Sequence, residues 1–142
     1  MKSEGAEDHF VVIYIMVIFW YYHRCTLVAS WLIRARGWRE GLAMRFGFVG
    51  IGSMGGPLAR SLVRAGEEVW FVGRNREHME AVLQAGPTAR CVEDAAALAD
   101  CDVVLTCLPL PQTVRKVMLG TEGLLTRLKP GSVYIDTSTI DP

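Results

Sequence analysis

A glycine-rich motif, Gly50-Ile51-Gly52-Ser53-Met54-Gly55, limits the folds open to this chain more than any other part of the sequence. This G-x-G-x-x-G pattern follows an apolar run at residues 46–50, which is typical of a buried strand. A helical pattern at residues 57–65 comes next, and Gly66 is expected to end it. Glycines placed between a strand and a helix indicate a βαβ unit, whereas isolated glycines usually mark only a turn.

From Met44 onward, short apolar runs alternate with helical patterns. Strands separated by helical patterns of roughly 10 to 15 residues predict βαβ units and a parallel sheet. Because crossovers between parallel strands are right-handed, the predicted fold class is α/β, a doubly wound parallel sheet of the Rossmann type. Beyond the first unit, we expect strands at 69–72, 88–92, 102–107 and 132–136, helices at 77–85, 93–99 and 112–119, and a helical turn around 124–128.

Residues 1–43 differ from the rest and form an N-terminal extension, which leaves 44–142 as the predicted domain. The extension is hydrophobic at residues 10–33, long enough for a membrane anchor because about 20 apolar residues suffice. Arg24 would then lie within the span, at a cost of roughly 2.5 to 3.5 kcal/mol. A targeting peptide is disfavoured, because the acidic residues near the start fit neither a secretory signal nor a transit peptide. A third interpretation is that translation begins at Met44 and the extension is spurious.

Composition excludes two classes of function. Basic and acidic residues balance at 15 each, so the chain offers no general electrostatic attraction for nucleic acid. The cysteines form no C-x-x-C pair and the three histidines are scattered, so no metal site is predicted. We interpret Cys101 and Cys107 as buried, reduced thiols.

Each glycine of the motif has a distinct expected task. Gly50 allows the tight turn, Gly52 lets a pyrophosphate approach the backbone, and Gly55 lets the helix pack against the strand. The N-terminus of the helix then offers N–H groups and its positive dipole end to the phosphates. The motif therefore predicts a dinucleotide site in which Ile51, Ser53 and Met54 also line the loop.

The residues after the second strand indicate which dinucleotide is preferred. A site for NAD has Asp or Glu here, which accepts a hydrogen bond from the ribose 2′-hydroxyl. This chain has Gly73-Arg74-Asn75-Arg76 instead. Because a guanidinium pairs bidentately with phosphate oxygens, Arg74 is suited to a 2′-phosphate. We predict that NADP is preferred and that NAD is a weaker ligand; solvated loop arginines are the alternative interpretation.

Two further loops follow predicted strands. Residues 108–111 follow the fourth strand, which should flank the switch-point crevice beside the first strand. Residues 137–139 follow the fifth strand and offer hydroxyl groups on the same rim.

The chain resembles the β-hydroxyacid dehydrogenases, which include 3-hydroxyisobutyrate dehydrogenase and are related to 6-phosphogluconate dehydrogenase. The resemblance rests on GFVGIGSMGGPLARSLVRAG at 47–66, CDVVLTCLP at 101–109 and LKPGSVYIDTSTIDP at 128–142. It covers residues 44–142 and none of residues 1–43.

The resemblance implies roles for residues outside the glycine motif. Arg74 and Asn75 would contact the 2′-phosphate end of the cofactor, and Leu108, Pro109 and Thr113 would line the riboses. Thr139 would lie near the nicotinamide ring. Two departures are Ser61, where the family often has asparagine, and Gly-Arg-Asn in place of Asn-Arg-Thr.

Family members continue into a glycine-rich substrate loop and a helical domain that carries the catalytic lysine and usually makes the dimer contacts. None of Lys2, Lys116 and Lys129 lies in a matching context, so no catalytic residue is predicted. We expect a cytoplasmic NADP(H)-binding domain of a 3-hydroxyisobutyrate dehydrogenase-like oxidoreductase, inactive as this fragment. The alternative is a non-catalytic NADP-binding module tethered to a membrane through residues 10–33.

Overall fold

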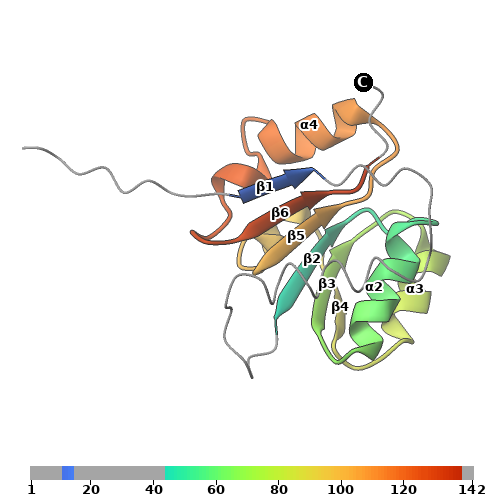
Figure 1. Cartoon of the computed structure of the whole chain (residues 1–142). Helices are drawn as coiled ribbons and strands as arrows, with labels where there is room; N and C mark the ends of the chain where they lie inside the picture. Colours follow the sequence, from blue (N-terminus) through green and yellow to red (C-terminus); the bar gives the residue numbers. More distant parts are fainter. Residues whose placement is uncertain (1–10, 15–43, 139–142) are drawn as a thin grey trace, which may run out of the picture.

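The computed structural model describes residues 11–14 and 44–138, which build an α/β fold around one parallel sheet (Figure 1). The sheet has six strands in the order β1-β6-β5-β2-β3-β4, and every neighbouring pair is parallel. The strands are β1 (Val11–Tyr14), β2 (Arg45–Val49), β3 (Glu68–Val72), β4 (Ala89–Cys91), β5 (Val103–Thr106) and β6 (Val133–Asp136). The helices are α2 (Gly55–Arg64), α3 (Arg76–Leu83) and α4 (Pro111–Leu119), with 3-10 turns η1 (Ala95–Leu98) and η2 (Leu124–Thr126).

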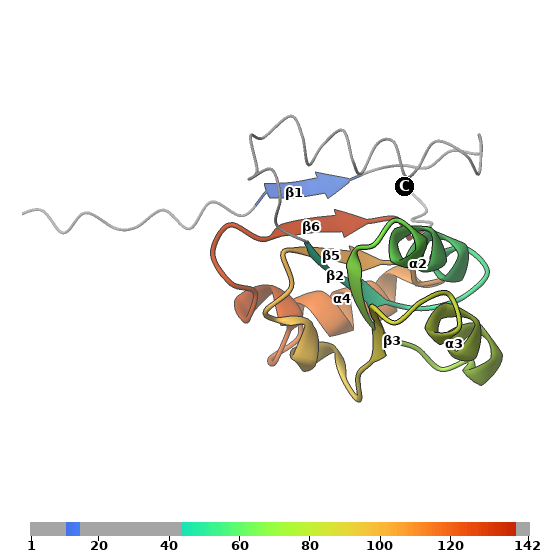
Figure 2. The same cartoon turned by 90° about the horizontal axis from the view of Figure 1, so that it is seen from below.

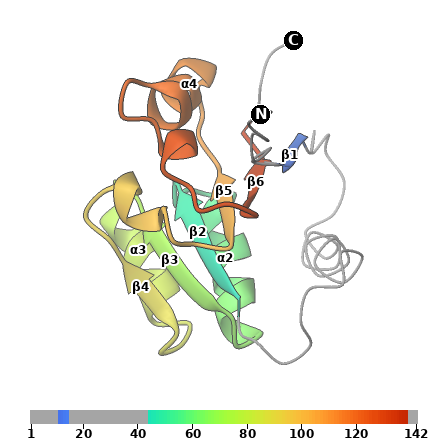
Figure 3. The same ribbon diagram turned by 90° about the vertical axis from the view of Figure 1, so that its left-hand side faces the viewer.

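Two apolar cores cover the two faces of the sheet, because alternate residues of each strand point to opposite sides. In β2, Phe46 and Phe48 belong to the core beneath α2 and α3, whereas Val49 belongs to the core beneath α4 and the 3-10 turns. Figure 3 shows α2 and α3 on one side of the strands and η1 on the other. The two layers of helices make the fold Rossmann-like, as the sequence predicts.

The predicted elements between residues 44 and 138 are confirmed, with ends that differ by at most two residues. The segment expected to be helical at 93–99 is a single 3-10 turn, η1, with Asp94 as its N-cap: the Asp94 side chain accepts from the Ala97 N–H. The last residue of α3, Leu83, is 42% exposed. Its neighbour Val82 fills the core beneath α3 instead.

The strand β1 is a finding that the sequence pattern does not predict, because residues 1–43 are expected to stand apart from the domain. Val11–Tyr14 pairs with β6 in parallel, with Val11 opposite Val133 and Tyr14 opposite Asp136. Figures 1 and 2 show β1 as the edge strand beside β6. Four residues of the apolar segment are therefore part of the sheet, and the remainder of residues 1–43 lies outside the described residues.

No helix within residues 11–14 and 44–138 is long and apolar enough to cross a membrane. The anchor expected at residues 10–33 lies outside the described part of the chain except for β1.

Candidate nucleotide-binding site

The carboxyl ends of β2 and β5 lie side by side at the point where the strand order of the sheet reverses. From β2 the chain passes through α2 to β3 on one side, and from β5 it passes through α4 to β6 on the other side. Because the loops diverge there, this switch point is where open α/β sheets bind ligands. The loop at residues 50–54 and the loop at residues 107–110 border it.

The glycine loop packs directly against the β5 loop. Gly50 has a φ of 97°, a conformation that side chains other than glycine rarely adopt, and its N–H donates to the carbonyl of Val72 at 3.0 Å. A Cβ on Gly50 would overlap the carbonyl oxygen of Cys107 and lie 2.9 Å from Cδ2 of Leu108. A Cβ on Gly55 would overlap the carbonyl oxygen of Gly50. Both positions therefore require glycine for the fold itself.

Gly52 differs from its two partners. Among the described residues other than its two chain neighbours, no atom would lie within 4 Å of a Cβ built on Gly52, so their packing does not explain this glycine. The space in front of it is open, and Ser53 and Met54 beside it are exposed, Met54 at 59%. This leaves a backbone cradle at the position where dinucleotide-binding motifs receive a pyrophosphate.

The N-terminus of α2 lies next to this cradle, where the Gly56 N–H donates to the Gly52 carbonyl at 2.9 Å. Met54 is the N-cap and makes no side-chain capping hydrogen bond, and the first turn, which begins Gly55-Gly56-Pro57, holds no acidic residue. The positive end of the helix dipole is thus not compensated by a carboxylate in this turn. Such a helix terminus favours a bound anion.

The two arginines in the loop after β3, Arg74 and Arg76, make different contacts. The Arg76 side chain forms an ion pair with Glu80 one turn later in α3, with Nε 2.7 Å from Oε1. Asn75 caps α3, because its Oδ1 accepts from the N–H of His78 at 3.1 Å. Arg74 is exposed and, within residues 44–138, has no ion-pair partner. Within residues 44–138, Arg74 is thus the unpaired arginine of this loop, whereas Arg76 uses its Nε in an exposed ion pair.

The residues expected along the riboses gather at the end of β5. Leu108 is half-buried against the glycine loop, Pro109 is exposed, and Thr113 lies half-buried in the first turn of α4. Thr139, expected near the nicotinamide ring, lies outside the described residues.

A buried polar network at the ends of β5 and β6 is not anticipated from the sequence. Thr106 is fully buried and Asp136 is 4% exposed, and the Thr106 hydroxyl donates to Oδ1 of Asp136 at 2.8 Å. The Ser138 N–H donates to the same oxygen at 2.9 Å. The sequence does contain one indication of this network, because Thr106 and Asp136 end two apolar strands that should be buried on both faces and would therefore need hydrogen-bond partners.

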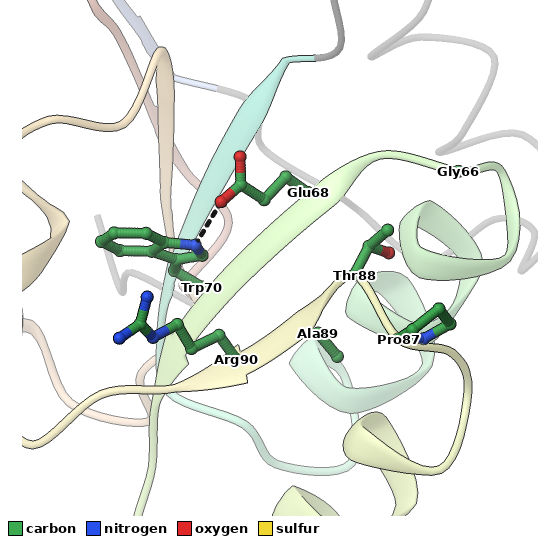
Figure 4. Close-up of a pocket in the computed structure, with 7 residues that line it drawn as sticks. All are labelled: Gly66, Glu68, Trp70, Pro87, Thr88, Ala89 and Arg90. Carbon is green, nitrogen blue, oxygen red and sulfur yellow. Dashed lines mark hydrogen bonds between the residues drawn. The ribbon is translucent and has the colours of Figure 1, made fainter.

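A second group of charged residues lies at the opposite, amino-terminal edge of the sheet. Glu68, Trp70 and Arg90 line an open pocket of about 450 Å³ there, in which the Trp70 Nε1–H donates to Glu68 at 2.8 Å (Figure 4). The Arg90 guanidinium lies 5.0 Å from the centre of the Trp70 ring. The residues lining this pocket come from the starts and middles of β3 and β4, so it is separate from the glycine loop.

Two titratable groups near this edge have shifted pKa values. Burial raises the pKa of the Cys101 thiol to about 12, which keeps it protonated and unreactive. Partial burial opposes ionisation of Asp102, but hydrogen bonds from the Lys129 side chain and the Arg45 N–H outweigh it and lower the pKa of Asp102 below 3.8.

Comparison with known proteins agrees with the class defined by this geometry, a Rossmann-like nucleotide-binding domain. Residues 45–142 match the family model described as the NAD binding domain of 6-phosphogluconate dehydrogenase. The chain belongs to this family, and its relatives include 3-hydroxyisobutyrate dehydrogenase-like proteins.

Three similar proteins illustrate the match. A probable mitochondrial 3-hydroxyisobutyrate dehydrogenase of Dictyostelium discoideum is 33% identical over 97 residues, which cover 68% of this chain and 30% of that protein. The cytokine-like nuclear factor N-PAC of Danio rerio is 33% identical over 99 residues, covering 69% and 21% respectively. A solved structure of Psf3 in complex with NADP+ and 2-OPP has a TM-score of 0.60 and 30% identity, covering 67% of this chain and 34% of that one. The chain thus spans between 21% and 34% of the length of these proteins.

Proposed function

We propose that residues 44–142 bind NADP(H) as the nucleotide domain of a 3-hydroxyisobutyrate dehydrogenase-like oxidoreductase that acts on small β-hydroxyacids or semialdehydes. The observation that carries the proposal is the contrast within the glycine motif. Gly50 and Gly55 are required by packing, whereas Gly52 faces space that the described part of the chain leaves open. A glycine that the fold does not need, at the N-terminus of an uncapped helix, is explained by a bound pyrophosphate.

The preference for NADP over NAD rests on the arginine loop. No carboxylate follows β3 to accept from a ribose 2′-hydroxyl, because Gly73, Arg74 and Asn75 take those positions. Arg76 is already paired with Glu80, so the 2′-phosphate would be held by Arg74 and by the exposed backbone at Asn75. The Psf3 structure contains NADP+, which agrees with this assignment.

The bound cofactor would supply the hydride chemistry, and the residues of this polypeptide bind and orient it. Leu108, Pro109 and Thr113 would line the riboses, and Thr139 would lie near the nicotinamide ring. Lys116 is exposed on α4 and Lys129 is paired with Asp102 at the opposite edge of the sheet, so neither is placed as a proton donor. We therefore expect the 142-residue polypeptide to bind NADPH without oxidising a hydroxyacid by itself.

Separate titrations of the 142-residue polypeptide with NADPH and NADH test the proposal. NADPH should bind at least about tenfold more tightly, since a 2′-phosphate gains charge-assisted hydrogen bonds that a hydroxyl does not. Equal binding would remove the NADP preference, and binding of neither would remove the proposed site. Turnover of 3-hydroxyisobutyrate above background would contradict the expected inactivity.

The location of the protein is a separate proposal. We propose a cytoplasmic protein, with attachment to a membrane through residues 10–33 as the alternative. Fractionation of cells expressing the full chain distinguishes them: recovery in the soluble fraction contradicts the anchor, and recovery in the membrane fraction that resists salt and alkali contradicts the cytoplasmic assignment.

A further inference from the structure

A buried carboxylate, that of Asp136, ends β6 at the rim of the switch-point crevice. It is 4% exposed, and its Oδ1 accepts two hydrogen bonds, from the Thr106 hydroxyl at 2.8 Å and the Ser138 N–H at 2.9 Å. Burying a carboxylate costs free energy that only good hydrogen bonds offset. Core packing alone does not explain a carboxylate at this position.

The hydrogen bonds run in one direction through the network. The single proton of the Thr106 hydroxyl is donated to Asp136, so the Tyr134 hydroxyl must donate to Thr106 across their 2.9 Å contact. On the other side, the Leu108 N–H donates to the Ser138 hydroxyl oxygen at 3.0 Å. Asp136 thereby connects the interior of the sheet to both rim loops, at residues 107–108 and at residues 137–138.

These two loops border one half of the crevice, and the arginine loop after β3 borders the other half. A dinucleotide lies across the switch point with one nucleotide on each half of the sheet. Arg74 follows β3 on one side, whereas Leu108 and Ser138 follow β5 and β6 on the other. Leu108 also contacts the glycine loop, since its Cδ2 lies 2.9 Å from the Cβ position of Gly50. A shift of this loop would therefore alter the nicotinamide side of the cradle first.

We propose that Asp136 is a positioning residue for the nicotinamide half of the cofactor, acting through Ser138 and Leu108. The proposal rests on the proposed function, because it presumes that a dinucleotide crosses the glycine loop. Asp136 itself is covered and does not touch the cofactor. It fixes the loops that do.

The test compares two probes on the full 142-residue chain. NADPH spans both halves of the site, whereas adenosine 2′,5′-bisphosphate occupies only the Arg74 half. Asp136→Ala should weaken NADPH binding about tenfold, because the loss of hydrogen bonds to a charged group releases both loops. The affinity for adenosine 2′,5′-bisphosphate should stay within about twofold. Asp136→Asn keeps an acceptor oxygen for Ser138 and should recover most of the NADPH affinity.

Ser132→Ala is the matched control. Ser132 is also buried in the segment entering β6, with its hydroxyl bonded to the carbonyls of Cys101 and Lys129, but it lies at the opposite edge of the sheet. It should lower stability without changing the ratio of the two affinities. If Asp136→Ala does not fold, Thr106→Val serves in its place. This substitution removes one hydrogen-bond partner of Asp136, and Thr106 is fully buried and so does not contact a ligand.

The outcomes separate the two proposals. A selective loss of NADPH affinity in the Asp136 or Thr106 variants, rescued by Asp136→Asn, supports the positioning role. Equal losses for both probes, or no loss for either, overturn the positioning role while the proposed function stands. If the unaltered chain binds neither probe, the proposed function is overturned and the positioning role with it.

Discussion

Gly55, the first residue of α2, lies so close to Gly50 that a Cβ on Gly55 would overlap the carbonyl oxygen of Gly50. For Gly52, between them, residues 11–14 and 44–138 place no atom within 4 Å of the Cβ position apart from its chain neighbours. The same motif thus contains two glycines that packing demands and one, Gly52, that the proposed pyrophosphate would explain.

Alanine substitutions should separate these two kinds. Gly55→Ala should lower the free energy of unfolding by about 1 to 3 kcal/mol, because the helix must move away from backbone that cannot yield. Gly52→Ala should leave the free energy of unfolding within about 1 kcal/mol of the original while weakening NADPH binding at least about tenfold. Urea denaturation and NADPH titration measure the two effects. A Gly52→Ala variant that binds NADPH normally would refute the pyrophosphate assignment.

The two arginines after β3 offer a similar internal comparison. Arg74→Ala should weaken NADPH binding about tenfold and leave NADH binding nearly unchanged, since only NADPH carries the 2′-phosphate. Arg76→Ala removes a nearby guanidinium that is already paired with Glu80 and 89% exposed, so it should change either affinity by less than about threefold. Parallel titrations of both variants measure this. If Arg76→Ala weakens NADPH binding more than Arg74→Ala does, the proposed assignment of the 2′-phosphate to Arg74 is wrong.

The sequence predicts the sheet well because its strands are local apolar runs and its helices end at glycines, as at Gly66. It predicts the glycine loop because the motif itself carries the geometry. It does not predict β1, because a 13-residue apolar run has no period that distinguishes a strand from a membrane span or a buried helix. Val11–Tyr14 form a strand by pairing with β6, which lies more than 100 residues away in the sequence.

The Asp136 network is hidden from the sequence for a related reason. Thr106 and Asp136 are ordinary polar residues at strand ends, and their pairing depends on the parallel register of β5 and β6. The different contacts of Arg74 and Arg76 likewise depend on α3, which places Glu80 one turn after Arg76. Sequence patterns identify elements and motifs, whereas contacts between elements decide which side chain is available.

Asp102 should give the protein a measurable dependence of stability on pH. Asp102 lies just before β5, and its carboxylate accepts from the Arg45 N–H of β2 at 2.9 Å and from the Lys129 ammonium, in the segment before β6, at 2.6 Å. Because its folded-state pKa lies below the ordinary value of 3.8, the stabilisation is fully present well above pH 3.8 and is lost as the pH falls through the folded pKa. Asp102→Asn should cost about 1 kcal/mol at pH 7, discounted for partial exposure.

Urea denaturation of both proteins between pH 7 and pH 3 tests this sign. The difference in free energy of unfolding should be largest at pH 7 and should shrink as the pH falls below 3.8. Lys129→Met, which removes a cation that lowers this pKa, should shift the loss of stability toward higher pH. A difference that stays constant over the whole range would show that the Asp102 carboxylate is not the group responsible.

The pairing of β1 with β6 predicts a pattern of hydrogen exchange at alternate residues. The Val133 N–H donates to Asp102 and the Thr137 N–H to Thr106, both toward β5. In a parallel strand, successive N–H groups point to opposite neighbours, so Ile135 also faces β5 whereas Tyr134 and Asp136 face β1. A chain that begins at Met44 should fold and bind NADPH, yet the Tyr134 and Asp136 amides should exchange at least about tenfold faster, because they lose their acceptors.

Val133 and Ile135 provide the control within the same strand, since their bonds to β5 remain in the shortened chain. The comparison applies to the monomer, identified by light scattering, because an exposed strand edge can pair with a second copy and regain protection. Unchanged protection of Tyr134 and Asp136 in a monomeric chain lacking residues 1–43 would mean that β1 does not hold the edge of β6. Faster exchange at those two amides alone would make residues 11–14 a structural part of the nucleotide-binding domain.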